Sequence, residues 1–164
     1  MRPRDLVEAV ERTLKGPFGI EHHVDELLDN FYRADPTGRQ AMIEGEPRLV
    51  EDAFADAFVG GVGEHLARRW GLSVPGWVRD ERRYLKAAVF HPDIPGHRRW
   101  MMAVAPVAFR VRLIFTGPEP LQRARFPYDG EVAVLSDGGA FENLAWSQRP
   151  TGAPRPNRAD HPHP

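Results

Sequence analysis

Cysteine is absent from this chain of 164 residues, and its absence excludes several kinds of chemistry at once. Without thiols there is no disulfide framework, no thiolate nucleophile and no zinc site with cysteine ligands. Lysine is almost as scarce, since Lys15 and Lys86 are the only lysines among 22 cationic side chains. The chain is also rich in alanine, glycine and proline. We therefore attribute its excess of arginine over lysine to a GC-rich genome. Arginine content alone is therefore no evidence of a binding site.

Long apolar segments are absent as well. No run approaches the roughly 18–20 apolar residues of a membrane-spanning helix. The N-terminal stretch MRPRDLVEAVERTL is charged throughout and lacks the apolar block of a secretory signal. We therefore expect a cytoplasmic protein without membrane contact. The length and the hydrophobic content of 41% predict a single domain with one core.

Sequence signatures of catalysis and phosphate binding are also absent. None of the three serines lies in a Gly-x-Ser-x-Gly elbow, and the GGVG segment at 60–63 is not followed by lysine. The sequence predicts no catalytic residue and no cofactor. Two carboxylates that meet only in the folded chain would, however, leave no such signature.

The charges that are present are distributed unevenly. Residues 1–72 carry 9 cationic and 14 acidic side chains, a net charge of −5, whereas residues 79–125 carry 10 and 4, a net charge of +6. The simplest explanation of this asymmetry lies within the protein, where acidic helices would pack against a basic layer. A basic surface for an anionic partner is the alternative.

Apolar residues spaced three and four positions apart predict a mainly α-helical fold, a single-domain helical bundle. Asp5 and Asp35 are the expected N-caps of the first and third helices. The longest helix, 47–70, should lie at the centre of the fold. Its glycines at 60, 61 and 63 either let another helix approach closely or mark a kink. The expected helices cover residues 5–14, 19–33, 36–44, 47–70, 80–89 and 96–104, with Trp100 and Met101 facing inward in the last.

The segment PVAFRVRLIF, residues 106–115, fits both a strand and a helix. Pro106 can begin a helix but would remove a hydrogen-bond donor from a central strand. We predict a helix over 106–112 and an extended chain over 113–115.

Beyond residue 117 the pattern changes. Two short apolar runs around residues 136–139 predict a small β-hairpin. The polar, proline-rich residues 147–164 predict a disordered tail. The expected organisation is a mainly helical domain over 1–146, followed by that tail.

Three stretches, EHLARRWGLSVPGWV, VFHP and PVAFRVRLIF, resemble the C-terminal, non-DNA-binding domain of bacterial Xre-type helix-turn-helix regulators and antitoxin-like proteins. The similarity covers about residues 20–116, and His91 is an insertion within the family's Phe-Pro step. It implies a helix at 106–112 and a partner-binding or sensor role. DNA binding is not implied, because residues 1–19 leave no room for a helix-turn-helix unit. The matching positions are Gly71, Leu72, Pro75, Trp77, Phe90, Pro92, Pro106, Phe109, Arg110, Arg112, Ile114 and Phe115.

Histidine with carboxylate is the one strong set of metal ligands that a chain without cysteine can offer. Two groups of such residues occur, one at 21–26 and one at 91–97, and together they could supply a site with two histidines and one carboxylate. We keep this site as an alternative, because charged residues at the start of a helix are ordinary surface. Its candidate ligands are His22, Asp25, His91 and His97.

Taken together, the sequence predicts a non-enzymatic regulatory or interaction protein that acts by protein–protein binding, antitoxin-like or associated with a transcription regulator. For Arg110 and Arg112, neutralising a carboxylate of the acidic half is the more ordinary role. The alternatives are a small metal-dependent enzyme and an accessory protein that binds nucleic acid through segment 98–125; a homo-oligomer is also compatible. The candidate partner-binding residues are Arg98, Arg99, Arg110, Arg112 and Arg123.

Overall fold

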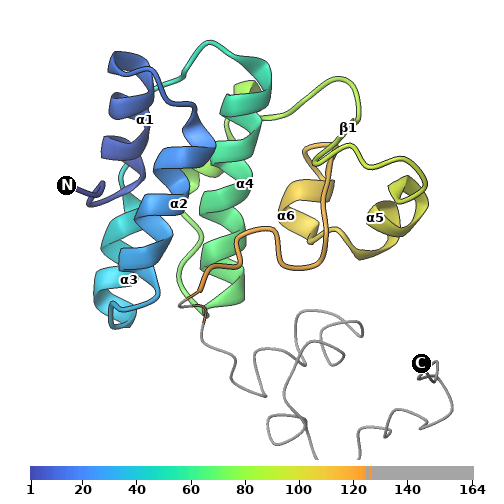
Figure 1. Ribbon diagram of the computed structural model, residues 1–164. Coiled ribbons are helices and arrows are strands. Elements are labelled where there is room, and N and C mark those ends of the chain that lie inside the picture. The colour runs from blue at the N-terminus through green and yellow to red at the C-terminus, as the bar shows by residue number, and fades with distance from the viewer. Residues whose placement is uncertain (125, 127–164) are drawn as a thin grey trace, which may run out of the picture. The chain divides into compact units, whose positions relative to one another are not determined.

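Six α-helices provide most of the regular structure in residues 1–124 and 126, the part that the computed structural model describes (Figure 1). The predicted mainly helical fold is confirmed. The predicted hairpin, the tail and the boundary at 146 lie outside the described residues. The elements are α1 (Leu6–Lys15), α2 (Ile20–Phe31), α3 (Pro36–Glu44), α4 (Ala53–Arg69), the 3-10 segments η1 (Gly76–Arg79) and η2 (Glu81–Arg83), β1 (Val89–Phe90), α5 (Arg98–Val104), α6 (Val107–Arg110) and β2 (Ile114–Phe115).

The first three helices form where the sequence predicts them. The Asp5 side chain accepts a hydrogen bond from the Glu8 N–H at 2.7 Å, and Asp35 accepts one from the Gly38 N–H at 2.7 Å. Each carboxylate satisfies one of the N–H groups that a helix start leaves free. Both predicted N-caps are therefore confirmed. Helices α1 and α2 lie side by side and bury their apolar stripes (Figure 1).

Helix α4 is the centre of the fold, as predicted. Every residue from Ala55 to Ala67 is buried, and the helix contacts α3, α6 and both 3-10 segments. It begins six residues later than predicted, at Ala53. The buried carboxylate of Asp56 accepts hydrogen bonds from the N–H groups of Val50 and Glu51, at 2.7 and 3.2 Å. These bonds hold the preceding residues in a loop that the apolar spacing does not reveal.

The glycines of α4 allow side chains from other segments to touch the helix backbone. A Cβ added at Gly61 would lie 2.7 Å from the ring of Phe109, and one at Gly63 would lie 2.6 Å from the ring of Trp77. The helix runs without interruption through these positions. Of the two predicted roles, close approach is therefore the correct one.

Residues 80–89 do not form the predicted helix. The Asp80 side chain accepts a hydrogen bond from the Arg82 N–H at 2.9 Å, which favours the short 3-10 segment η2. The chain then extends into β1, which pairs in parallel with β2. Pairing with a segment more than 20 residues away, Val89 with Ile114, overrides the local helical spacing.

The segment at 106–115 forms a helix followed by a strand, as predicted, but the helix already ends at Arg110 and the extended chain begins only at Ile114. Helix α6 makes one turn after Pro106, and β2 follows it. Leu113 joins the two with a φ of 60°, a left-handed conformation that ends the helical turn. None of the described helices is long and apolar enough to span a lipid bilayer.

A buried histidine should make the stability depend on pH. His65 lies in the middle of α4, with its ring 5.6 Å from that of Phe109. Burial, aided by the charge of Arg69, lowers the pKa of His65 to about 4. Between pH 6.5 and 4, His65 is protonated in the unfolded chain but stays neutral in the folded chain. The free energy of unfolding should therefore fall by about 3 kcal/mol as the pH falls through this window.

Urea unfolding at several pH values checks this, with His65→Leu as the control that cannot titrate. The wild-type protein should lose more stability than the variant between pH 6.5 and 4. Equal losses in both proteins would show that His65 does not carry the effect.

Candidate interaction surface

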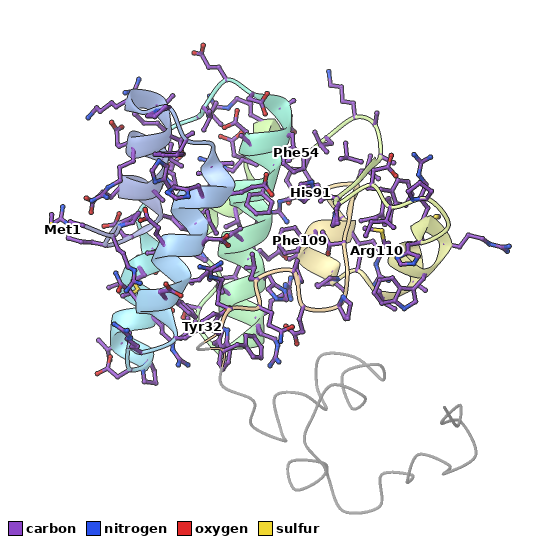
Figure 2. The ribbon with its side chains drawn as sticks, in the orientation of Figure 1. Met1, Tyr32, Phe54, His91, Phe109 and Arg110 are labelled. Atoms are coloured by element: carbon purple, nitrogen blue, oxygen red, sulfur yellow. The ribbon has the colours of Figure 1, made fainter. Side chains whose placement is uncertain are left out.

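Helix α6 divides its side chains between the core and the solvent. Ala108 and Phe109 are buried, whereas Val107, Arg110 and Val111 are exposed, the two valines at 49% each. The exposed positions are spaced i, i+3 and i+4, so they share one helix face. The exposed arginine is thus flanked by two exposed valines, and Figure 2 shows Phe109 on the side of α6 towards α4 and Arg110 on the side away from it.

Helix α5 is exposed over most of its circumference. Met101 is its buried side chain, while Trp100 and Met102 are 51% and 52% exposed. The prediction that Met101 faces inward is confirmed, and the same prediction for Trp100 is wrong. The Trp100 side chain is partly covered, by neighbours that include the His97 ring at a centroid distance of 6.2 Å and the backbone at Gly117. A helix of seven residues is not stable by itself, so contacts such as that of Met101 hold it in place.

Exposed apolar side chains concentrate in the segment that contains these two helices. Eight large apolar side chains are exposed in the described residues, and five of them lie within 94–111. Such side chains normally occur singly on a monomer surface. Figure 1 shows α5 and α6 beside each other, on the side of α4 away from α1. We call this region the α5–α6 surface; it consists of Ile94, Arg98, Arg99, Trp100, Met102, Val107, Arg110 and Val111.

The α5–α6 surface is also positively charged. Residues 94–117 contain four arginines and no acidic residue, and three of the arginines are exposed. Arg98 donates two hydrogen bonds to the Asp93 carboxylate, at 2.9 and 2.7 Å, and they lower the pKa of Asp93. Within residues 1–124 and 126, Arg99 and Arg110 form no ion pair. Their charges are available to a partner.

Arg112 does not belong to this surface, and its assignment as a partner-binding residue is corrected. Its side chain is fully buried and donates a hydrogen bond to Glu64 Oε2 at 2.7 Å. Two further bonds, both of 2.6 Å, go to the carbonyl groups of Ala108 and Val78. The other expectation for Arg112, neutralising a carboxylate of the acidic half, is confirmed.

Arg123 also lies away from α5 and α6. Its guanidinium pairs with Asp25 at 3.2 Å and approaches Asp29 at 3.7 Å, both on α2. Burial raises the pKa of Asp25 despite the attraction of Arg123. The pair ties the described C-terminal residues to α2, and Arg123 therefore contributes to packing between segments.

The four candidate metal ligands do not come together. His91 Nε2 lies 2.5 Å from Glu21 Oε1, and the ring of His97 lies against Trp100. Asp25 is paired with an arginine, and none of these three shares a ligand cluster with His22 in the described residues. The alternative site of His22, Asp25, His91 and His97 is therefore not formed in the described residues.

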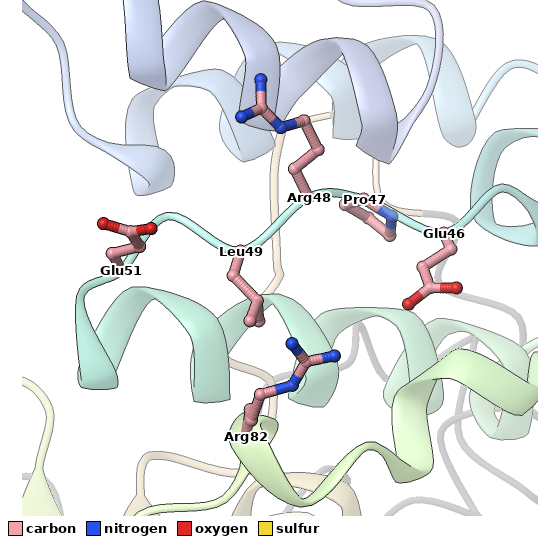
Figure 3. Close-up of a pocket in the computed structure, with 6 residues that line it drawn as sticks. All are labelled: Glu46, Pro47, Arg48, Leu49, Glu51 and Arg82. Carbon is pink, nitrogen blue, oxygen red and sulfur yellow. The ribbon is translucent and has the colours of Figure 1, made fainter.

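A shallow hollow of about 400 Å³ lies between the 45–52 loop and η2 (Figure 3). Acidic and basic side chains both line it, and Leu49 and Arg82 extend towards each other across it. Opposite charges side by side do not select a ligand of one sign. Its lining residues are Glu46, Pro47, Arg48, Leu49, Glu51 and Arg82.

The described residues form a small, mainly helical fold in which segment 94–111 exposes several apolar and arginine side chains. Comparison of the chain with protein-family models, curated proteins and solved structures returned no match. The resemblance to the C-terminal domain of Xre-type regulators stays a prediction.

Proposed function

We propose that this protein is a non-enzymatic interaction protein that binds another protein through the α5–α6 surface. The observation that carries this proposal is the exposure of Trp100 and Met102 in a segment whose Arg99 and Arg110 form no ion pair within residues 1–124 and 126. Tryptophan, methionine and arginine are enriched in protein–protein interfaces, where lysine and acidic residues are depleted. The α5–α6 surface has this composition.

The same residues indicate the chemistry of the partner. A complementary partner offers an apolar recess for Trp100, Val107 and Val111, with carboxylates placed for Arg99 and Arg110. Exposed valine and methionine gain little from a phosphate backbone, so an acidic, apolar protein surface fits better than nucleic acid. A regulatory, antitoxin-like role follows from the family resemblance and is part of the proposal.

Partner capture tests the proposal through a pair of matched variants. The tagged full-length chain is used to capture proteins from lysate of the source cells, and the bound proteins are quantified by mass spectrometry. Trp100→Ala should weaken binding of the partner about 30-fold, because truncating an interface hot spot costs about 2 kcal/mol. Phe18→Ala should leave binding of the partner unchanged, because Phe18 is 54% exposed but lies far from α5 and α6 in the sequence.

Loss of the partner in both variants, or in neither, would contradict the proposal. Recovery of nucleic acid, with binding that falls steeply with salt and is lost in Arg99→Ala/Arg110→Ala, would favour the nucleic-acid alternative. Arg48→Ala is the charge control, because the Arg48 side chain is 73% exposed on the 45–52 loop.

A further inference from the structure

Three side chains on the first two turns of α2 bring metal-ligating atoms together. His22, His23 and Glu26 each offer one ligand atom, and these atoms lie within 4.8 Å of one another. Glu26 Oε2 lies 3.5 Å from His23 Nδ1 and 3.9 Å from His22 Nε2. Two ligands bound to one tetrahedral ion at about 2.0–2.1 Å are about 3.4 Å apart. Small side-chain rotations therefore suffice to reach ligand geometry.

The burial of His23 is an independent indication. The residue is only 7% exposed, yet neither ring nitrogen has a hydrogen-bond partner among the described residues. The 3.5 Å separation between His23 Nδ1 and the Glu26 carboxylate is too long for a good hydrogen bond. Buried polar groups almost always have a partner, because leaving one without costs about 1–3 kcal/mol. An ion bound to Nδ1, the nitrogen nearer to Glu26, would provide a partner for that nitrogen.

Phe18 fixes the orientation of both imidazoles. Its ring stacks on His22 with a centroid distance of 4.5 Å and meets His23 edge-on at 6.4 Å. His22 is exposed and Glu26 is half-buried, so an ion can enter from solvent. His23 also lines an open hollow of about 430 Å³ next to α1, which leaves room for water or a small anion as a further ligand.

The charges carried by α2 itself favour a cation, whereas those lining the hollow balance each other. Helix α2 carries four acidic side chains and no lysine or arginine. Glu8 and Glu11 of α1 line the hollow together with Arg12 and Lys15 and leave it without excess positive charge. Glu21, the acidic residue in the first turn of α2, offsets the positive end of the α2 dipole.

We infer that His22, His23 and Glu26 bind a divalent transition-metal ion of the zinc class. Two imidazoles and one carboxylate suit zinc, iron, cobalt and nickel, whereas magnesium and calcium prefer oxygen ligands alone. The bound ion stabilises the first turns of α2 together with Phe18. The site is separate from the α5–α6 surface and does not depend on the proposed function.

Titration calorimetry with zinc chloride tests this inference on the full-length chain. His161→Gln and His163→Gln are introduced first into every protein compared, because those two histidines offer metal ligands of their own. One zinc ion should bind per chain. His22→Gln, at an exposed position, and Glu26→Gln should each weaken binding about tenfold or more. His97→Gln, at an exposed histidine outside the group, should leave the affinity unchanged.

Cobalt(II) gives a second readout, because a tetrahedral site produces a strong visible absorption band that His22→Gln should reduce. Thermal unfolding should shift upward with zinc in the parent protein and in His97→Gln, and by less in Glu26→Gln at the same zinc concentration. The inference is wrong if no stoichiometric zinc binds, or if neither His22→Gln nor Glu26→Gln changes the affinity.

Discussion

Replacing Glu64 with alanine should lower the free energy of unfolding by about 3–5 kcal/mol, because the substitution leaves a buried guanidinium without its carboxylate. The Arg112 side chain has no exposed surface, and that of Glu64 is only 9% exposed. Burial acts to raise the pKa of Glu64, but hydrogen bonds from Arg112 and Arg68 outweigh it and hold the pKa below its usual value. The pair is therefore charged at neutral pH, and each partner depends on the other.

Arg68→Ala provides the matched control. Arg68 also pairs with Glu64, at 2.8 Å, but its side chain is 56% exposed, so its loss should cost less than about 1 kcal/mol. Urea unfolding of both variants measures the difference. If Glu64→Ala lowers the free energy of unfolding no more than Arg68→Ala does, the buried pair of Glu64 and Arg112 does not contribute the expected stability.

Alanine at Gly61 or Gly63 should also destabilise the protein, by about 1–3 kcal/mol each. In an ordinary helix the same change stabilises by about 1 kcal/mol. Here the new methyl group would lie 2.7 Å from the ring of Phe109 or 2.6 Å from that of Trp77. Phe109 is fully buried, and Trp77 Nε1 donates a hydrogen bond to the Ile43 carbonyl at 3.1 Å, so neither ring can move freely.

Gly76→Ala is the control for this prediction, because a Cβ at Gly76 meets no atom within 4 Å. Thermal unfolding should place this variant within about 0.5 kcal/mol of the wild-type protein. A higher melting temperature for Gly61→Ala than for the wild-type protein would mean that α4 and α6 do not pack as closely as described.

Local signals explain which parts of the fold the sequence predicts. Asp5 and Asp35 act on residues only three positions away, so the starts of α1 and α3 are visible in the sequence. The start of α4 depends on the buried Asp56 and its bonds to the preceding loop. The loss of the expected helix at 80–89 depends on strand pairing with 114–115. Such non-local contacts leave no periodic pattern.

The candidate surface was only partly predictable for the same reason. Charge counting identifies the basic segment, but it does not distinguish Arg110, which faces solvent, from Arg112, which enters the core. The spacing of α5 does not show that about half of the Trp100 side chain is exposed. The spacing of His23 and Glu26, three residues apart, is visible in the sequence, whereas the burial of the His23 ring is not.

Photo-crosslinking in the source cells tests the central claim most directly, namely that the α5–α6 surface docks another protein. A photoreactive aromatic residue replaces Trp100 in the full-length chain, and Phe18 in a second version with similar exposure. After irradiation, the first version should form a covalent adduct with one protein, and the second should not. No adduct from position 100, the same adducts from both positions, or an adduct with nucleic acid would contradict the claim.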